Sequence, residues 1–287
     1  SGECDLTRYE EAARLFADVR PEIVVHAAAD VGGIGYNRLY PADIFRNNLL
    51  MACNVLEACR RHSVAVRRPG VQKLVIVGSS CAYPGEVPAT MREADFLAGP
   101  MHPSVECYGF SKRALYLGAK AYGEQFGLNS IFLLVTNMYG PHDKFDPKES
   151  HVVAALVRKF VEACDSGDPA VECWGTGAPV REFLYVEDCA EAVLRAAERY
   201  EGPDPLNVGT GIGTSIRELA ETIARITEFD GEVCWDATKP DGAMKKVLDV
   251  SRMVEALDWS PPTGLEEGLG RTIEWYRANR PGRGPCG

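Results

Sequence analysis

Short apolar runs alternate along this chain with longer stretches in which apolar residues recur every three or four positions. The runs at residues 23–29 (IVVHAAA), 74–77 and 131–135 predict strands, because each is a short and largely apolar stretch. The periodic stretches at 42–61 and 106–126 predict amphipathic helices. Strands that alternate with long helices are typical of an α/β protein with a parallel sheet.

The pattern loosens after residue 151. Helices are expected at 216–226 and 265–278, with short strands around VECWG and PLNVG. We therefore expect a sheet domain over residues 1–150 and a smaller lobe over 151–287. The segment VEDCAEAVLRAAERY is expected to return from this lobe to the sheet.

Composition narrows the class of protein. The 287 residues, 46% of them hydrophobic, suit one large or two unequal domains, and the net charge of −10 argues against a nucleic-acid partner. We expect no membrane partner, because no apolar run is long enough to span a bilayer, and a cytoplasmic location, because no secretory signal pattern occurs. The ten cysteines are scattered without a C-x-x-C pair, which predicts reduced thiols and no metal site.

The most informative local pattern is Tyr108-Gly-Phe-Ser-Lys112. A spacing of four places both side chains on one helix face, where the ammonium is expected to stabilise a phenolate and lower the pKa of Tyr108. Such a tyrosine can protonate a carbonyl oxygen while hydride reaches its carbon. Alone, the pattern also occurs by chance on exposed helices. Ser79, at the end of the preceding strand, supports the functional interpretation, because its hydroxyl can hold the same oxygen.

This order of Ser, Tyr and Lys resembles the extended short-chain dehydrogenase/reductase family that acts on nucleotide sugars. The segments that carry the resemblance are AAADVGGI, YPADIFRNNLL, GSSCAYP, TNMYGPHDKF, SHVVAALVRKF, WGTGAPVREFLYVEDCAEA and KPDGAMKKVLDV. It implies a Rossmann-like parallel sheet with a C-terminal substrate lobe. It further implies epimerisation at C3 and C5 and NADPH-dependent reduction at C4 of GDP-4-keto-6-deoxymannose to GDP-L-fucose. A homodimer through helices 42–61 and 106–126 is also implied, although their apolar faces could equally be core.

The resemblance assigns the acid/base roles in both inversions to Cys81 and His151. A thiol with a pKa of about 8.5 and an imidazole of about 6.5 suit proton transfer beside a ketone. The competing interpretations are a small buried hydrophobe for Cys81 and a packing residue at a helix start for His151. We expect the other histidines to be structural: His26, His62, His102 and His142.

Binding residues follow from the same resemblance. For NADP, they are Ala28, Val77, Gly78, Ser80, Lys112, Val135, Thr136, Asn137 and Met138. For the GDP-sugar, they are Lys159, Trp174 and Arg181, with Lys239 and Asp241 as weaker candidates because a Pro-Asp-Gly turn needs no ligand. The loop Gly209-Thr-Gly-Ile-Gly213 is one residue short of a dinucleotide fingerprint, and we assign it to the second lobe.

The sequence departs from the family at its beginning. Family members start with a strand, a glycine-rich turn and a second strand, whereas this sequence starts at SGECDLTRYE, so we expect a truncated dinucleotide-binding domain over 1–150 with residues 23–29 as a sheet edge. A fragment, an excised product or a divergent form would explain this. VAVRRPG is expected to be an insertion. Two alternatives stay open: another nucleotide-sugar epimerase or dehydratase, and a non-catalytic nucleotide-sugar-binding protein.

Overall fold

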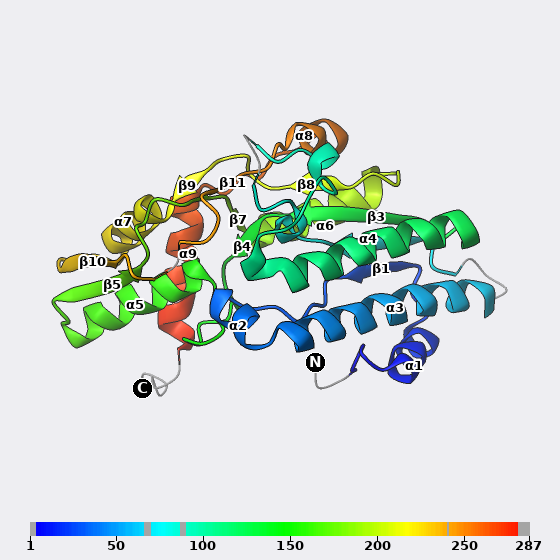
Figure 1. The fold of residues 1–287 in the computed structure, drawn as a ribbon, viewed down its shortest axis with the longest axis horizontal. Coiled ribbons are helices and arrows are strands. Elements are labelled where there is room, and N and C mark those ends of the chain that lie inside the picture. Colours follow the sequence, from blue (N-terminus) through cyan, green and yellow to red (C-terminus); the bar gives the residue numbers. More distant parts are fainter. Residues whose placement is uncertain (1–3, 66–69, 87–89, 240, 281–287) are drawn as a thin grey trace.

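A parallel four-stranded sheet forms the larger end of the molecule (Figure 1). The computed structural model describes residues 4–65, 70–86, 90–239 and 241–280. The sheet has the order β1 (Ile23–His26), β2 (Lys73–Val77), β3 (Ser130–Val135) and β8 (Leu206–Val208), and all its pairs are parallel. This confirms the predicted α/β class and its Rossmann-like parallel sheet.

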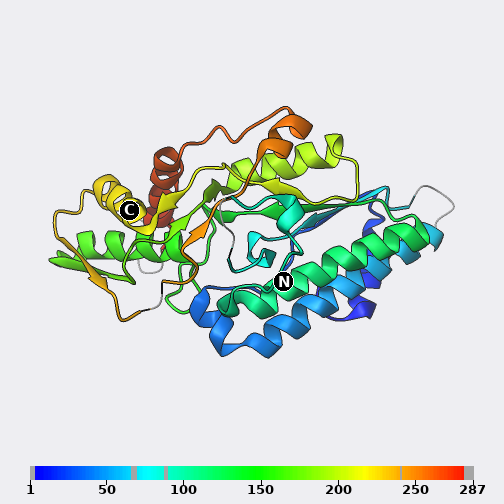
Figure 2. The same cartoon turned by 45° about the horizontal axis from the view of Figure 1, so that its top comes forward.

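Alternate residues of β2 point into two different cores. Leu74 and Ile76 pack with α1 (Tyr9–Val19), α3 (Pro41–Ala65) and α4 (Glu106–Phe126), whereas Val75 packs with α6 (Val186–Arg199) and α8 (Ser251–Leu257). Figure 2 shows these two helical layers on opposite sides of the sheet. The continuous apolar run of β2 is therefore explained by burial on both faces. The segment VEDCAEAVLRAAERY, as α6, packs against β2 and β3.

One edge of this sheet is open in the described part of the chain. There, β1 pairs with β2 alone, and its Ile23 and Val25 side chains are 54% and 46% exposed. This agrees with the expectation that residues 23–29 would lie at an edge. The strand itself is shorter than predicted, because it ends at His26, before the AAAD loop.

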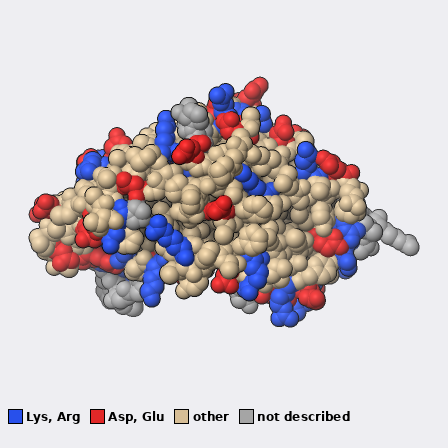
Figure 3. Space-filling view, viewed as in Figure 1, with Lys and Arg blue, Asp and Glu red and all other residues tan. Residues whose placement is uncertain are grey.

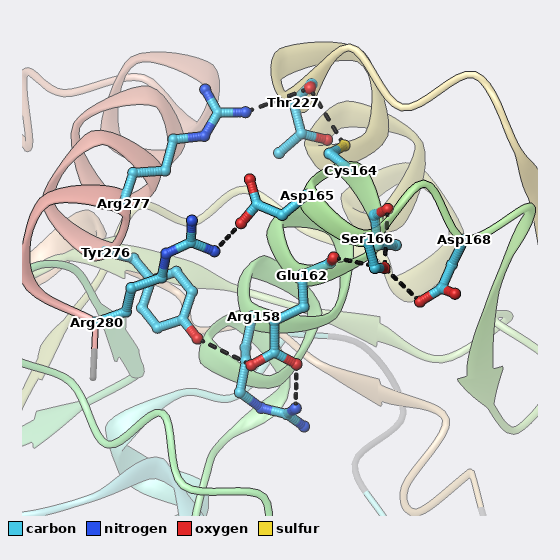
Figure 4. A network of polar contacts seen from close by, with 11 residues as sticks. Arg158, Glu162, Cys164, Asp165, Ser166, Asp168, Thr227, Tyr276, Arg277 and Arg280 are labelled. Atoms are coloured by element: carbon cyan, nitrogen blue, oxygen red, sulfur yellow. Dashed lines mark hydrogen bonds and ion pairs between the residues drawn. The ribbon is translucent and has the colours of Figure 1, made fainter. Parts of the chain in front are cut away.

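The smaller end of the molecule has its own core. The helices α5 (Val152–Ser166), α7 (Ile216–Thr227) and α9 (Leu265–Asn279) pack around β5 (Ala170–Trp174), which pairs with β10 (Glu232–Asp236). Two polar contacts hold α5 against the C-terminal part of α9 (Figure 4). The hydroxyl of Tyr276 on α9 donates to Glu162 on α5, and Arg280, which follows α9, forms an ion pair with Asp165 on α5.

Shorter elements connect the two ends. Two small sheets are formed, one by β4 (Asn137–Tyr139) with β7 (Phe183–Tyr185), and one by β6 (Val180–Arg181) between β9 (Thr214–Ser215) and β11 (Lys245–Lys246). The remaining elements are α2 (Ile34–Leu39) and the short 3-10 helices η1 (Ser80–Ala82), η2 (Glu93–Asp95) and η3 (Pro103–Val105).

One of these connections leads into α7, and a predicted insertion lies elsewhere in the chain. The helix α7 begins at the capping box formed by Ser215 and Glu218, because each side chain accepts a hydrogen bond from the other residue's backbone N–H. The predicted insertion VAVRRPG falls largely on residues 66–69, which lie outside the described residues. None of the helices in the described ranges is long and apolar enough to cross a membrane.

Candidate active site

The GSSCAYP segment turns sharply where β2 ends. The Gly78 N–H donates to the Leu133 carbonyl at 2.7 Å, and a side chain at Gly78 would collide with Phe132. Ser79 then caps η1, because its hydroxyl accepts a hydrogen bond from the Cys81 N–H at 3.1 Å. This turn places Ser79 and Cys81 together at the carboxyl end of the sheet, where parallel sheets bind their ligands.

The first turn of α4 lies directly against this segment. A Cβ added at Gly109 would stand 2.6 Å from the Cys81 carbonyl oxygen, so glycine is what allows the close approach. Tyr108 and Lys112 are both buried on this side of α4, and the Lys112 ammonium lies 5.7 Å from the centroid of the Tyr108 ring. The same ammonium donates to the Val77 carbonyl at 3.0 Å. Tyr108 and Lys112 thus share one helix face, as the spacing predicts.

The predicted electrostatic effect on Tyr108 is wrong. Burial raises the pKa of the Tyr108 phenol well above its usual range, and the nearby Cys81 adds to this, whereas the Ser79 hydroxyl opposes it. Burial also lowers the pKa of Lys112, to about 8. Because both groups are buried, the cost of charging them in a poorly solvated environment exceeds the attraction expected from the helix spacing. Tyr108 therefore holds its proton at neutral pH.

His26, which was expected to be structural, is a further titratable group near Lys112. It ends β1, is buried, and lies within electrostatic range of Lys112. Burial, with a contribution from Lys112, lowers the pKa of His26 to about 4, so the ring is neutral at physiological pH. No local motif identifies this pair, because β1 and α4 meet only through the tertiary fold.

His151 stands immediately before α5. Its side chain reaches solvent, but the surrounding protein is dense enough that desolvation lowers the pKa of His151. The carboxylate of Asp143, in the preceding loop, opposes this shift. The backbone beside His151 is fixed as well, because the Gly33 N–H donates to the Glu149 carbonyl at 3.1 Å.

Arg181 lies beside Cys81 in a poorly solvated position. Burial lowers the pKa of Arg181, and its charge is favoured by Cys81 and by Asp241. The next residue, Glu182, is fully buried, and its carboxylate accepts hydrogen bonds from three backbone N–H groups: those of Thr210, Gly211 and Leu248, at 2.6, 3.0 and 2.7 Å. Glu182 is a second residue that the sequence pattern did not single out.

These bonds bear on the glycine loop that follows β8. Glu182 occupies the backbone N–H groups of Thr210 and Gly211. They are therefore not available to hold a phosphate, which agrees with setting this loop aside as a dinucleotide fingerprint.

The other predicted substrate residues gather at the smaller end. Trp174 is 61% exposed, and its ring centroid lies 5.8 Å from the Lys159 ammonium and 5.6 Å from that of Lys239. An exposed aromatic face with two cations suits a base and a phosphate. Asp241 has a structural role, because its carboxylate accepts hydrogen bonds from both the backbone N–H and the hydroxyl of Thr176.

A parallel sheet with Ser79, Tyr108 and Lys112 at its carboxyl end defines the class of short-chain dehydrogenases/reductases. Residues 2–209 match the family described as the NAD dependent epimerase/dehydratase family, and this chain belongs to that family.

Curated relatives and solved structures agree with this class. GDP-L-fucose synthase 1 from Arabidopsis thaliana is 41% identical over 96% of this chain and 83% of its own length. GDP-L-fucose synthase from Escherichia coli (strain K12) is 40% identical over 93% of this chain and 83% of its own length. A gdp-l-fucose synthetase from Naegleria fowleri bound to NADP has a TM-score of 0.87 at 26% identity, covering 97% of this chain and 84% of that one.

Proposed function

We propose that this chain catalyses the GDP-L-fucose synthase reaction: epimerisation at C3 and C5 of GDP-4-keto-6-deoxymannose, followed by reduction at C4 with NADPH. The relatives of about 40% identity support the substrate and the reaction. The observation that carries the proposal is the packing of α4 on the Cys81 turn at Gly109. It brings a thiol, which plain reduction does not need, beside the reducing tyrosine.

Each inversion needs one group to remove a proton next to the ketone and another to return a proton from the opposite face. In this proposal Cys81 and His151 perform these transfers. Ser79 and Tyr108 hold the oxygen on which negative charge develops. NADPH, when bound, supplies the hydride to C4. Tyr108 then gives its proton to the C4 oxygen, and its raised pKa keeps that proton in place until the transfer.

The residues at the carboxyl end of the sheet fit the cofactor. Lys112 is buried, yet Val77 is the one hydrogen-bond partner of its ammonium among the described residues, although an ammonium has three donors. The remaining donors suit hydroxyl groups of a bound dinucleotide. The residues proposed to hold NADP are Ala28, Val77, Gly78, Ser80, Lys112, Val135, Thr136, Asn137 and Met138.

The GDP-sugar is proposed to extend from this site to the smaller end of the molecule. Trp174 would pack against a ring, and Lys159 and Lys239 lie close enough to it to meet phosphate oxygens. Cys81 and Asp241 both influence the pKa of Arg181, so the Arg181 guanidinium lies within electrostatic range of each.

On the face shown in Figure 3, positive and negative side chains are interspersed rather than gathered in one basic stripe.

A homodimer is part of the proposal. The Phe45 and Phe110 rings, on α3 and α4, stack at a centroid distance of 6.0 Å although they are 39% and 50% exposed. Leu50 and Leu117 on the same helices are 40% and 50% exposed. An exposed apolar surface of this kind suits a self-complementary interface. Sedimentation of Leu117→Glu beside the unaltered protein tests this, and an unchanged mass would contradict it.

A cytoplasmic location also remains a proposal. It is supported by the free thiols of the cysteines in the described part of the chain.

The activity is tested by mass spectrometry of the product formed from GDP-4-keto-6-deoxymannose and NADPH in heavy water. We expect reduction at C4 together with deuterium at C3 and C5. Cys81→Ala and His151→Ala should each reduce deuterium incorporation. Reduction without deuterium would indicate a simple C4 reductase, and unchanged substrate with measurable GDP binding would favour the non-catalytic alternative.

A further inference from the structure

A cavity of about 630 Å³ opens beside the proposed active site. It is lined by Gly85, Glu86 and His102 and by residues 242–245. Gly85 and Glu86 follow the Cys81 turn in the chain. A Cβ added at Gly242 would stand 3.3 Å from the Arg181 guanidinium, so this cation lies close to a residue that lines the cavity.

Hydrogen bonds fix the orientation and the tautomer of His102. Its Nδ1 accepts the backbone N–H of Ser104 at 3.3 Å and lies 2.8 Å from the Ser104 hydroxyl. Because Nδ1 accepts from a backbone N–H, it carries no proton in the neutral ring, and the hydroxyl must donate to it as well. The remaining hydrogen is therefore on Nε2, at the far end of the ring from Ser104.

The charges around His102 favour an anion. Burial lowers the pKa of His102, and the cations Lys246 and Arg181 lower it further. Lys245 also lines the cavity, and Glu86 is the carboxylate on its wall. The ring thus stays neutral within electrostatic range of two cations, Lys246 of β11 and Arg181 of β6. An oxyanion placed among these groups would pair with both cations and accept a hydrogen bond from the Nε2–H.

We infer that His102 is a substrate-binding residue whose Nε2–H donates to the diphosphate of the nucleotide sugar, alongside Arg181 and Lys246. This inference rests on the proposed function and adds a residue that the sequence pattern indicated to be structural. The competing role is purely local: His102 caps η3, because its ring accepts the Ser104 N–H. Asparagine is a strong N-cap residue but does not extend as far as Nε2 of histidine, so His102→Asn separates the two roles.

The test is calorimetric titration of the full chain with GDP and, separately, with GDP-L-fucose. We expect His102→Asn to bind both ligands about tenfold more weakly, since a hydrogen bond to a charged group is lost. Ser104→Ala, which keeps the ring but removes one of the bonds that fix it, should weaken both by a few-fold. His62→Asn, at the end of α3, is the matched control and should bind as the unaltered protein does.

The outcomes are distinct. Equal affinities for His102→Asn and the unaltered protein would mean that His102 only caps η3, and the inference would be wrong. A loss confined to GDP-L-fucose would overturn the diphosphate contact in favour of a hexose contact. Absence of GDP binding by the unaltered protein would contradict the proposed function itself. Should His102→Asn have a lower melting temperature, the comparison rests on Ser104→Ala, for which unchanged affinity would likewise overturn the inference.

Discussion

Mild acid should destabilise this protein through His26, and the substitution His26→Leu should remove that effect. The pKa of His26 is about 4 in the folded protein, compared with 6.5 for a histidine in an unfolded chain. As the pH falls through 6.5, the unfolded chain takes up a proton that the folded protein does not take up until about pH 4. Stability is therefore present above pH 6.5 and is lost progressively between 6.5 and about 4.

The magnitude follows from the size of this shift. A difference of about 2.5 pKa units at about 1.4 kcal/mol each corresponds to a loss of about 3 kcal/mol across the window. His26 is only 4% exposed, so solvent screening reduces this value little. Lys112 has a pKa of about 8, so it stays protonated throughout the window and its charge does not change.

The assay is urea unfolding followed by fluorescence at pH 7, 6, 5 and 4. The unaltered protein should lose about 3 kcal/mol more than His26→Leu between pH 7 and pH 4. The control His62→Asn removes a histidine that packs against Phe16 and should leave the pH dependence close to that of the unaltered protein. Parallel pH profiles for the unaltered protein and His26→Leu would refute the argument that burial holds His26 neutral.

Three further predictions concern the site and its support. Tyr108→Phe should slow reduction by roughly 10²- to 10⁴-fold, because the proton donor to the C4 oxygen is lost, as followed by NADPH absorbance. Deuterium exchange, followed by product mass, should slow less, because Ser79 still holds the developing oxyanion; equal losses of both would contradict the division of roles. Gly109→Ala should displace the Cys81 turn and lower kcat/KM by roughly 10²-fold, whereas Gly270→Ala, where nothing lies within 4 Å of the new Cβ, should not. Glu182→Gln should lower the free energy of unfolding by roughly 1–3 kcal/mol in urea titrations, because an amide has one acceptor oxygen and at least one of the three N–H donors loses its acceptor; an unchanged midpoint would count against this.

Local patterns predicted the elements that depend on local interactions. The helix expected at residues 106–126 is α4 over Glu106–Phe126, because its apolar spacing and the glycine after it act within one segment. The capping box of Ser215 and Glu218 is another feature that depends on one short segment alone. The shared helix face of Tyr108 and Lys112 likewise follows from a spacing of four.

Properties set by tertiary packing were not predictable in this way. The direction of the Tyr108 pKa shift depends on total burial, which spacing does not reveal. The nearness of His26 to Lys112, and of His102 to Arg181, arises between elements that are distant in the sequence. Glu182 was missed because its carboxylate accepts hydrogen bonds from backbone N–H groups. Almost every residue has such a group, so the partners of Glu182 cannot be recognised from their side chains.

The way in which Glu182 binds has a consequence for how the substrate specificity of this protein can be altered. Its three partners are backbone groups in the glycine loop after β8 and in the segment after β11. Because no side chain of Thr210, Gly211 or Leu248 is needed for these bonds, neighbouring side chains can vary while the backbone frame around Arg181 is kept. The region beside the cavity is therefore a suitable target for directed evolution toward other sugars, with Glu182 left unchanged as its anchor.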